Sequence, residues 1–139
     1  MKISEVMHRG ASSVGPDAAI TKIAKIMSDM DVGSIPVAEN GRVIGIVTDR
    51  DIALRAVANG KDVSRLTARD IMSSKVNCCR ELEDLDTAAR MMERNHIRRL
   101  PVLDDNDRLV GMVSLGDVCH AASQRLTADV VKAVSAHHA

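Results

Sequence analysis

Hydrophobic residues recur along this chain at the spacing of an amphipathic helix in two segments. In each segment they occupy positions i, i+3, i+4 and i+7, which lie on one helix face: Ile20, Ile23, Ala24 and Met27, then Leu85, Ala88, Ala89 and Met92. Asp17 follows Pro16 before the first segment, so we predict that Asp17 caps that helix. A second helix is predicted to begin near Asp49 in one half and near Leu115 in the other, and Gly60 is typical of a helix end.

Short β-rich segments accompany these helices. Residues 34–38 and 42–47 are separated by Asn40-Gly41, a strong signal for a two-residue hairpin turn. The other predicted strands are residues 99–103 and 109–113, joined by a longer polar loop, and residues 11–14 and 76–79, which precede the first helices. Each half therefore has the predicted order β-α-β-β-α, and the fold class is mixed α/β (α+β).

The two halves are an internal repeat. Ile35-Pro36-Val37 aligns with Leu100-Pro101-Val102 at an offset of 65 residues (100 − 35), and the second copy then gains one residue, so that Asp51 aligns with Asp117. We predict repeats at residues 1–62 and 63–123, followed by an amphipathic helical tail at residues 124–139. One short hairpin does not make either half robust alone, so we expect the repeats to pack sheet to sheet with pseudo-twofold symmetry.

Composition excludes several classes of function. The 19 Lys and Arg balance 19 Asp and Glu, whereas general nucleic-acid or acidic-membrane binders have a basic excess. Phe, Trp and Tyr are absent, so bases cannot stack on aromatic rings. No apolar run approaches the roughly 18 residues of a membrane span, and three cysteines, two of them adjacent, suit a reducing compartment. We expect a cytoplasmic protein that binds neither nucleic acid nor membrane.

Each repeat carries a hydrophobic-Pro-hydrophobic strand followed by Gly-hydrophobic-hydrophobic-Thr/Ser-x-x-Asp. The first set is Ile35-Pro36-Val37 with residues 45–51, and the second is Leu100-Pro101-Val102 with residues 111–117. These motifs resemble the CBS (cystathionine-β-synthase) domain family, and two copies resemble the tandem pair called a Bateman module. The resemblance implies a regulatory module that binds AMP, ADP, ATP, NAD or S-adenosylmethionine between the repeats without catalysis. It also implies a homodimer that regulates another, unidentified protein.

The resemblance assigns Asp51 and Asp117 to the ribose of such a ligand, with Thr48 and Ser114 beside them. A carboxylate accepts from both vicinal hydroxyls, and each charge-assisted bond contributes about 1.5–3 kcal/mol. The same Thr/Ser-x-x-Asp spacing also resembles a capping box, in which hydroxyl and acid hold the first turn of a helix. Two copies in register favour ligand binding for at least one of the sites.

The two expected sites differ in charge. Arg98 and Arg99 precede the proline strand of the second repeat, where residues 33–34 of the first are Gly-Ser. The resemblance implies that a basic residue here contacts phosphates, and the planar arginine fork suits two phosphate oxygens. Arg94 and His96 add positive charge nearby. We therefore expect the second site to favour phosphorylated ligands.

Adenine would lie between aliphatic side chains, since the chain has no aromatic ring. The candidates lie just before Thr48 and Ser114: Ile46, Val47, Met112 and Val113. The same residues are equally consistent with a packed core.

Metal and catalytic chemistry lack the spacing that they need. Cys78-Cys79, Cys119-His120 and His137-His138 show neither the two-residue zinc spacing nor a His pair at i, i+4. The chain contains no Gly-x-Ser-x-Gly elbow and no Walker loop. We expect no metal site and no catalytic residue. Two alternatives stay open: a ligand-free assembly module whose Asp51 and Asp117 only cap helices, and a metal- or redox-responsive stress protein that uses the Cys and His groups.

Overall fold

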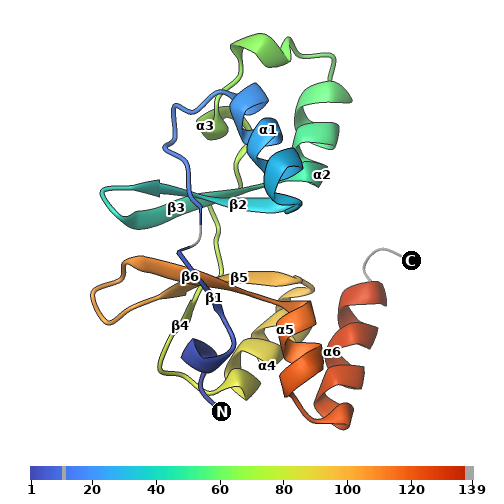
Figure 1. Ribbon diagram of the computed structural model, residues 1–139. Helices are drawn as coiled ribbons and strands as arrows, with labels where there is room; N and C mark the ends of the chain where they lie inside the picture. The colour runs from blue at the N-terminus through green and yellow to red at the C-terminus, as the bar shows by residue number, and fades with distance from the viewer. Residues whose placement is uncertain (11, 137–139) are drawn as a thin grey trace. The chain divides into compact units, whose positions relative to one another are not determined.

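The computed structural model describes residues 1–10 and 12–136, and the chain divides into two compact units (Figure 1). Unit 1 combines Met1–Ala11 with Asn77–Ala139, and unit 2 is Ser12–Val76. These units differ from the sequence repeats expected at residues 1–62 and 63–123, because the N-terminal segment packs with the second repeat. The predicted mixed class of helices and strands is confirmed.

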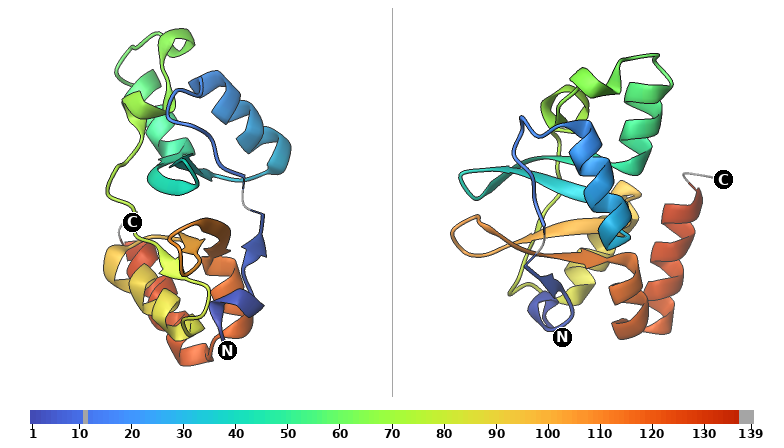
Figure 2. Two further views of the ribbon diagram at one scale, coloured as in Figure 1. Left: turned by 90° about the vertical axis from the view of Figure 1, so that its left-hand side faces the viewer. Right: turned by 45° about the horizontal axis from the view of Figure 1, so that its top comes forward.

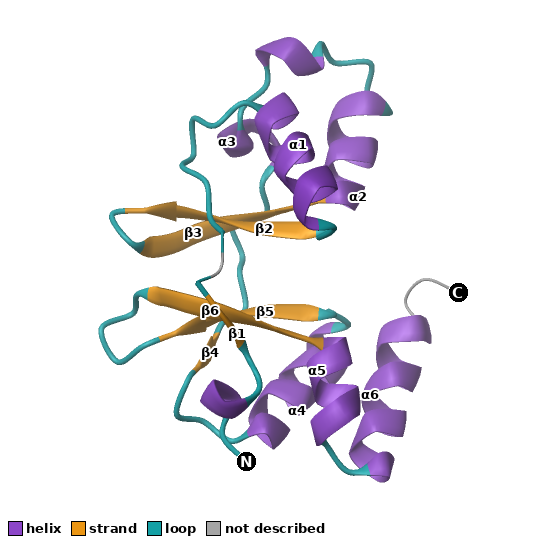
Figure 3. Ribbon diagram, viewed as in Figure 1, coloured by secondary structure: helices purple, strands orange, loops and turns teal. Residues whose placement is uncertain are grey.

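Unit 2 is a β-hairpin with helices on one face (Figure 3). Its elements are α1 (Ile20–Met30), β2 (Ser34–Glu39), β3 (Arg42–Thr48), α2 (Asp49–Asp51), the π-helix η2 (Ile52–Val57), the 3-10 helix η3 (Val63–Arg65) and α3 (Ala68–Ile71). Strands β2 and β3 pair antiparallel. Asn40 and Gly41 have φ angles of 55° and 80°, as the predicted two-residue turn requires.

Two features of unit 2 depart from the sequence predictions. Helix α1 begins at Ile20 with Ala19 as its N-cap and no capping side chain, so the prediction for Asp17 is wrong. The Asp17 carboxylate lies 3.9 Å from Arg69 Nε and is 89% exposed. The helix after β3 widens into η2, where Ala58 N donates to the carbonyl five residues earlier at 2.8 Å.

Unit 1 contains a four-stranded sheet in the order β1-β6-β5-β4. Its elements are the 3-10 helix η1 (Ile3–Glu5), β1 (His8–Arg9), β4 (Cys79–Arg80), α4 (Leu85–Asn95), β5 (Arg99–Leu103), β6 (Leu109–Ser114), α5 (Leu115–Ala121) and α6 (Gln124–Ala136). Strand β1 runs antiparallel to β6, and β4 runs parallel to β5. The predicted C-terminal helix is present as α6. None of the helices that the structure describes is long and apolar enough to span a bilayer.

The short strands predicted before the first helices are displaced. Pairing occurs at β1 and β4, while Val14 makes a single parallel bridge to Val37. Residue 11, where the first of these strands was expected to begin, lies outside the described residues.

Each unit has its own hydrophobic core. The apolar stripe of α1 is buried at Ile20, Ile23 and Met27, but Ala24 is exposed, whereas its counterpart Ala89 on α4 is fully buried. The difference arises because α6 packs along α4 (Figure 2) and buries three of its own side chains there. These are Leu126, Val130 and Val134.

Candidate strand–helix junction sites

The junction after β3 joins Thr48 to Asp51. Thr48 N donates to Asp51 Oδ2 at 2.9 Å, and Asp51 N donates to Thr48 Oγ1 at 3.0 Å. These reciprocal bonds form a capping box at the start of α2. The second carboxylate oxygen, Asp51 Oδ1, lies 3.6 Å from Arg55 Nε, and 15% of the Asp51 side chain is exposed.

The junction after β6 repeats this arrangement with Ser114 and Asp117. Ser114 N and Ser114 Oγ donate to Asp117 Oδ2 at 2.8 and 3.0 Å, and Asp117 N lies 3.2 Å from Ser114 Oγ. Asp117 Oδ1 lies 3.1 Å from His8 Nε2, and 15% of the Asp117 side chain is exposed. Capping is therefore confirmed at both junctions, and in each it uses one of the two carboxylate oxygens.

A third capping box lies at the start of α3, outside the predicted sites. Thr67 N and Thr67 Oγ1 donate to Asp70 Oδ2 at 2.8 and 3.1 Å. The backbone bond first, and then the side-chain bond, lower the pKa of Asp70. A capping box alone is therefore a local folding device, and Asp70 is a natural control for any further role of Asp117.

Arg98 and Arg99 lie at the same junction as Ser114. Leu115 N donates to the Arg98 carbonyl at 2.8 Å, and Arg99 is the cross-strand partner of Ser114. Both arginines are exposed. Unit 1 thus brings together the residues predicted for ribose and for phosphate.

Small residues occupy the equivalent place in unit 2. Asp49 N donates to the Gly33 carbonyl at 2.9 Å, and Ser34 is the cross-strand partner of Thr48. A Cβ added to Gly33 would lie 3.1 Å from Asp49 Oδ2, so the carboxylate closely covers this position. Gly33 and Ser34 thus occupy the same backbone positions in unit 2 that Arg98 and Arg99 occupy in unit 1.

The four predicted adenine-lining residues divide between two environments. Val47 and Val113 are 0% exposed and belong to the cores of their units, whereas Ile46 and Met112 are partly exposed. Successive side chains of a strand point to opposite faces, so neighbouring residues cannot all face one ligand. The prediction is corrected accordingly: Val47 and Val113 pack the interior, and Ile46 and Met112 lie on the other face.

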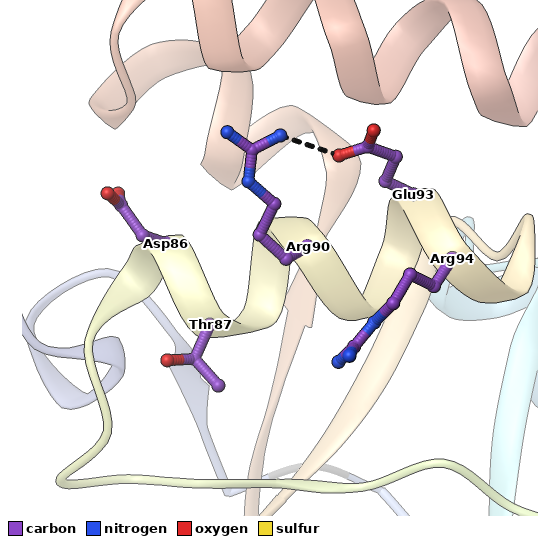
Figure 4. A pocket seen from close by; sticks show the side chains of 5 residues that line it. All are labelled: Asp86, Thr87, Arg90, Glu93 and Arg94. Carbon is purple, nitrogen blue, oxygen red and sulfur yellow. Dashed lines mark hydrogen bonds and ion pairs between the residues drawn. The ribbon is translucent and has the colours of Figure 1, made fainter.

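Arg94 belongs to α4, and His96 is the residue at which α4 ends. His96 Nδ1 is 2.9 Å from the Ala133 carbonyl of α6. Arg94 lines a hollow of about 500 Å³ over α4 (Figure 4). The other lining residues are two acids, a base and a threonine, with Arg90 and Glu93 bonded at 2.8 Å: Asp86, Glu93, Arg90 and Thr87. This mixed surface does not extend the positive charge of the arginine pair.

The cysteines have different surroundings. Burial raises the pKa of the Cys79 thiol in β4 to about 12 and also raises the pKa of Cys78, while Cys119 on α5 is exposed. Within residues 1–10 and 12–136, no three His, Cys, Asp or Glu side chains converge on a place for a metal ion. The candidates His137 and His138 lie outside the described residues.

His8 is the residue at these junctions whose position the sequence pattern does not reveal. His8 contacts Asp117, which lies 109 residues further along the chain. It belongs to β1, which has only two residues and is therefore too short to show an alternation of polar and apolar positions. The repeat itself holds a signal, since position 8 corresponds to Ser73, which bridges Ile46 in unit 2. Because Ser73 lies beside β3, the repeat places position 8 beside the corresponding strand, β6.

Comparison with known proteins identifies the repeated unit. The CBS domain family matches residues 3–57 and 68–124. The CBS domain-containing protein YhcV of Bacillus subtilis is 38% identical over 120 residues, which cover 84% of this chain and 81% of YhcV.

Two solved structures share the fold at similar identity. Hypoxic Response Protein I, determined with two coordinated zinc ions, is 27% identical with a TM-score of 0.80, covering 88% of this chain and 100% of that one. The CBS domain pair of protein MJ0100, in complex with 5'-methylthioadenosine and S-adenosyl-L-methionine, is 28% identical with a TM-score of 0.78. The match covers 86% of this chain and 94% of the MJ0100 chain.

Proposed function

This chain belongs to the CBS domain family, and on that premise we propose that it is a regulatory module that binds an adenosine-containing ligand without reacting with it. The observation that carries the proposal is the junction of β6 with α5. There Asp117 Oδ1 lies outside the capping box, and exposed Arg98 and Arg99 adjoin Ser114. The adenosine compounds bound to the MJ0100 pair support this ligand class.

The ribose is proposed to bind Asp117 through one carboxylate oxygen. Oδ2 already accepts two hydrogen bonds from Ser114, so a ribose hydroxyl is directed to Oδ1. A charge-assisted bond of this kind contributes about 1.5–3 kcal/mol. Asp51 offers the equivalent oxygen beside Thr48 in unit 2.

Phosphates are proposed to bind Arg98 and Arg99. Both side chains are exposed, the backbone of both residues adjoins Ser114 and Leu115, and an arginine fork can hold two phosphate oxygens. Unit 2 has Gly33 and Ser34 at the matching place, so we propose that it binds nucleotides more weakly. AMP, ADP and ATP are the ligands that fit this charge best, and NAD and S-adenosylmethionine are the next candidates.

The adenine ring is proposed to contact aliphatic side chains on the partly exposed face of the last strand in each unit. Met112 of β6 and Ile46 of β3 are the residues of the original set that lie there. Backbone groups of the same strands would read the edge of the base. Val47 and Val113 support these strands from the core.

The output is proposed to be a change in a surface that another protein recognises. A ligand shifts such an equilibrium only by its difference in affinity for the two states. We propose a cytoplasmic homodimer as the working form, because an isologous pair doubles the regulatory surface without a further component.

Thermal unfolding with a panel of AMP, ADP, ATP, NAD, S-adenosylmethionine and zinc tests the proposal. A ligand at 100 times its Kd stabilises the folded state by about 2.7 kcal/mol, and we expect micromolar binding, about −8 kcal/mol. Calorimetry is the suitable readout because the chain has no Trp or Tyr. If no adenosyl compound raises the Tm, the assembly interpretation replaces this one. If zinc alone raises it, the metal interpretation does.

A further inference from the structure

His8 lies against the carboxylate oxygen that we assign to the ribose. Strand β1 places His8 opposite Met112 of β6, and this pairing holds Nε2 at 3.1 Å from Asp117 Oδ1. The His8 side chain is 77% exposed, whereas that of Asp117 is 15% exposed. The imidazole can therefore swing into solvent without disturbing the core of unit 1.

The acceptor positions of Asp117 are nearly all in use. A carboxylate offers about four lone-pair positions, two on each oxygen. Ser114 N and Oγ take those of Oδ2, and His8 takes one on Oδ1. One position on Oδ1 remains, so two vicinal ribose hydroxyls can both bind this oxygen only if the imidazole leaves it.

We propose that His8 and the ribose compete for Asp117 Oδ1, so that ligand binding at unit 1 weakens in acid. Histidine changes its charge between about pH 5 and 8. The imidazolium forms a charge-assisted bond to a carboxylate, which is stronger than the bond from neutral imidazole. Acid therefore strengthens the competitor. The inference rests on the proposed function, since both use the same oxygen.

Asp117 is the charged group that His8 contacts, because the neighbouring charged side chains have other partners. Arg9, the next residue of β1, pairs with Glu81 at 3.6 Å. Strand β6, against which β1 lies, carries no ionisable side chain. On α5, His120 bonds the backbone of its own helix at 2.7 Å. The His8 imidazole therefore acts directly on the proposed ribose acceptor.

Among the residues that the structure describes, unit 2 has an arginine, and no histidine, against the corresponding carboxylate oxygen. Asp51 Oδ1 faces Arg55 Nε at 3.6 Å, and an arginine keeps its charge throughout this pH range. The position corresponding to His8 is Ser73, and the position corresponding to Arg55 is Ala121. The proposed pH dependence is therefore a property of the Asp117 site.

The test uses the full chain with adenosine, because a phosphate would itself titrate near about pH 6. NMR shifts of the Ser114 and Asp117 amides report on this site alone. We expect wild-type affinity to be about two- to fivefold weaker near about pH 5.5 than near about pH 8. His8→Gln keeps a neutral N–H donor and should bind equally at both pH values. His120→Ala, which removes a second exposed imidazole, should retain the wild-type dependence.

The outcomes separate this inference from the proposed function. Adenosine binding that is independent of pH in wild type, or unchanged in its pH dependence by His8→Gln, refutes the competition and leaves the ribose site standing. Failure of adenosine to bind at either pH overturns the site and the competition together. Imidazole ¹⁵N spectra give a readout without ligand, because the contact with Asp117 requires a proton on His8 Nε2. A wild-type ring protonated at Nδ1 would refute the contact.

Discussion

Asp117 and Asp70 perform the same capping task, yet the proposal gives only Asp117 a second one. Asp117→Ala and Asp70→Ala each remove the acid of a capping box, so we expect both to lower the stability of the folded chain. Only Asp117→Ala should lose ATP affinity, about ten- to a hundredfold. Calorimetric titration of both variants measures this difference, and unchanged affinity in Asp117→Ala would reduce that residue to a cap. We expect Asp51→Ala to lose less, because unit 2 lacks the arginine pair.

Arg99 separates phosphate recognition from nucleoside recognition. Arg99→Ala is expected to weaken AMP and ATP about tenfold and to spare adenosine, because only the phosphates meet its guanidinium. Arg65→Ala provides the control, since this side chain of η3 in unit 2 is 87% exposed and carries the same charge. Calorimetric titration of wild type and of both variants with AMP, ATP and adenosine measures this difference in affinity. Equal losses for AMP, ATP and adenosine in Arg99→Ala would remove the phosphate role.

The sequence predicts the acidic and basic residues of the junctions better than the apolar ones. Arg99 lies opposite Ser114 because the end of one antiparallel strand must lie beside the end of its partner once the hairpin forms. Val113 was wrongly grouped with Met112 because a hydrophobic run does not itself say which face is covered. The sequence did not predict a role for His8, because its contact with Asp117 depends on the pairing of two distant segments.

Among the elements, local rules succeed where one chemical requirement dominates. The glycine of the first motif, Gly45, lies where the chain packs closely, since a Cβ there would lie 2.5 Å from Met72 Sδ. The Asn40-Gly41 turn formed as predicted because both residues tolerate positive φ. The Asp17 cap failed because the N-cap of α1 is Ala19, two residues further along, and helix ends are the least determined part of a periodic pattern.

Strand β4 makes stability depend on alkaline pH through Cys79. Burial raises its pKa from an ordinary value of 9.0 to about 12, so the folded chain retains a proton that the unfolded chain releases. The contribution is complete below pH 9.0 and declines as pH rises from 9.0 to about 12. Denaturant unfolding across this range should show wild type losing stability faster than Cys79→Ala. Parallel pH profiles for the two proteins would contradict this linkage.

For the whole molecule, the repeat was predictable but the division into packing units was not. Residues 6–7 and 71–72 occupy equivalent positions in the two copies. In the structure, residues 1–11 join the unit that holds the second repeat, and residues 63–76 join the other. The segment that precedes each repeat has the same sequence pattern whether it packs against its own repeat or against the other one. Pattern alone therefore could not choose between these arrangements.

This exchange has a consequence that point substitutions can measure. Ile3, at 0% exposure, packs in the core of unit 1, although the sequence places it in the first repeat, while Ile71 packs in the core of unit 2. Either Ile→Ala change should cost about 2–5 kcal/mol. Because the units have separate cores, Ile3→Ala should reduce amide-exchange protection more in β5 and β6 than in β2 and β3, and Ile71→Ala should do the reverse. Equal losses in all four strands for both variants would mean that the two cores unfold together.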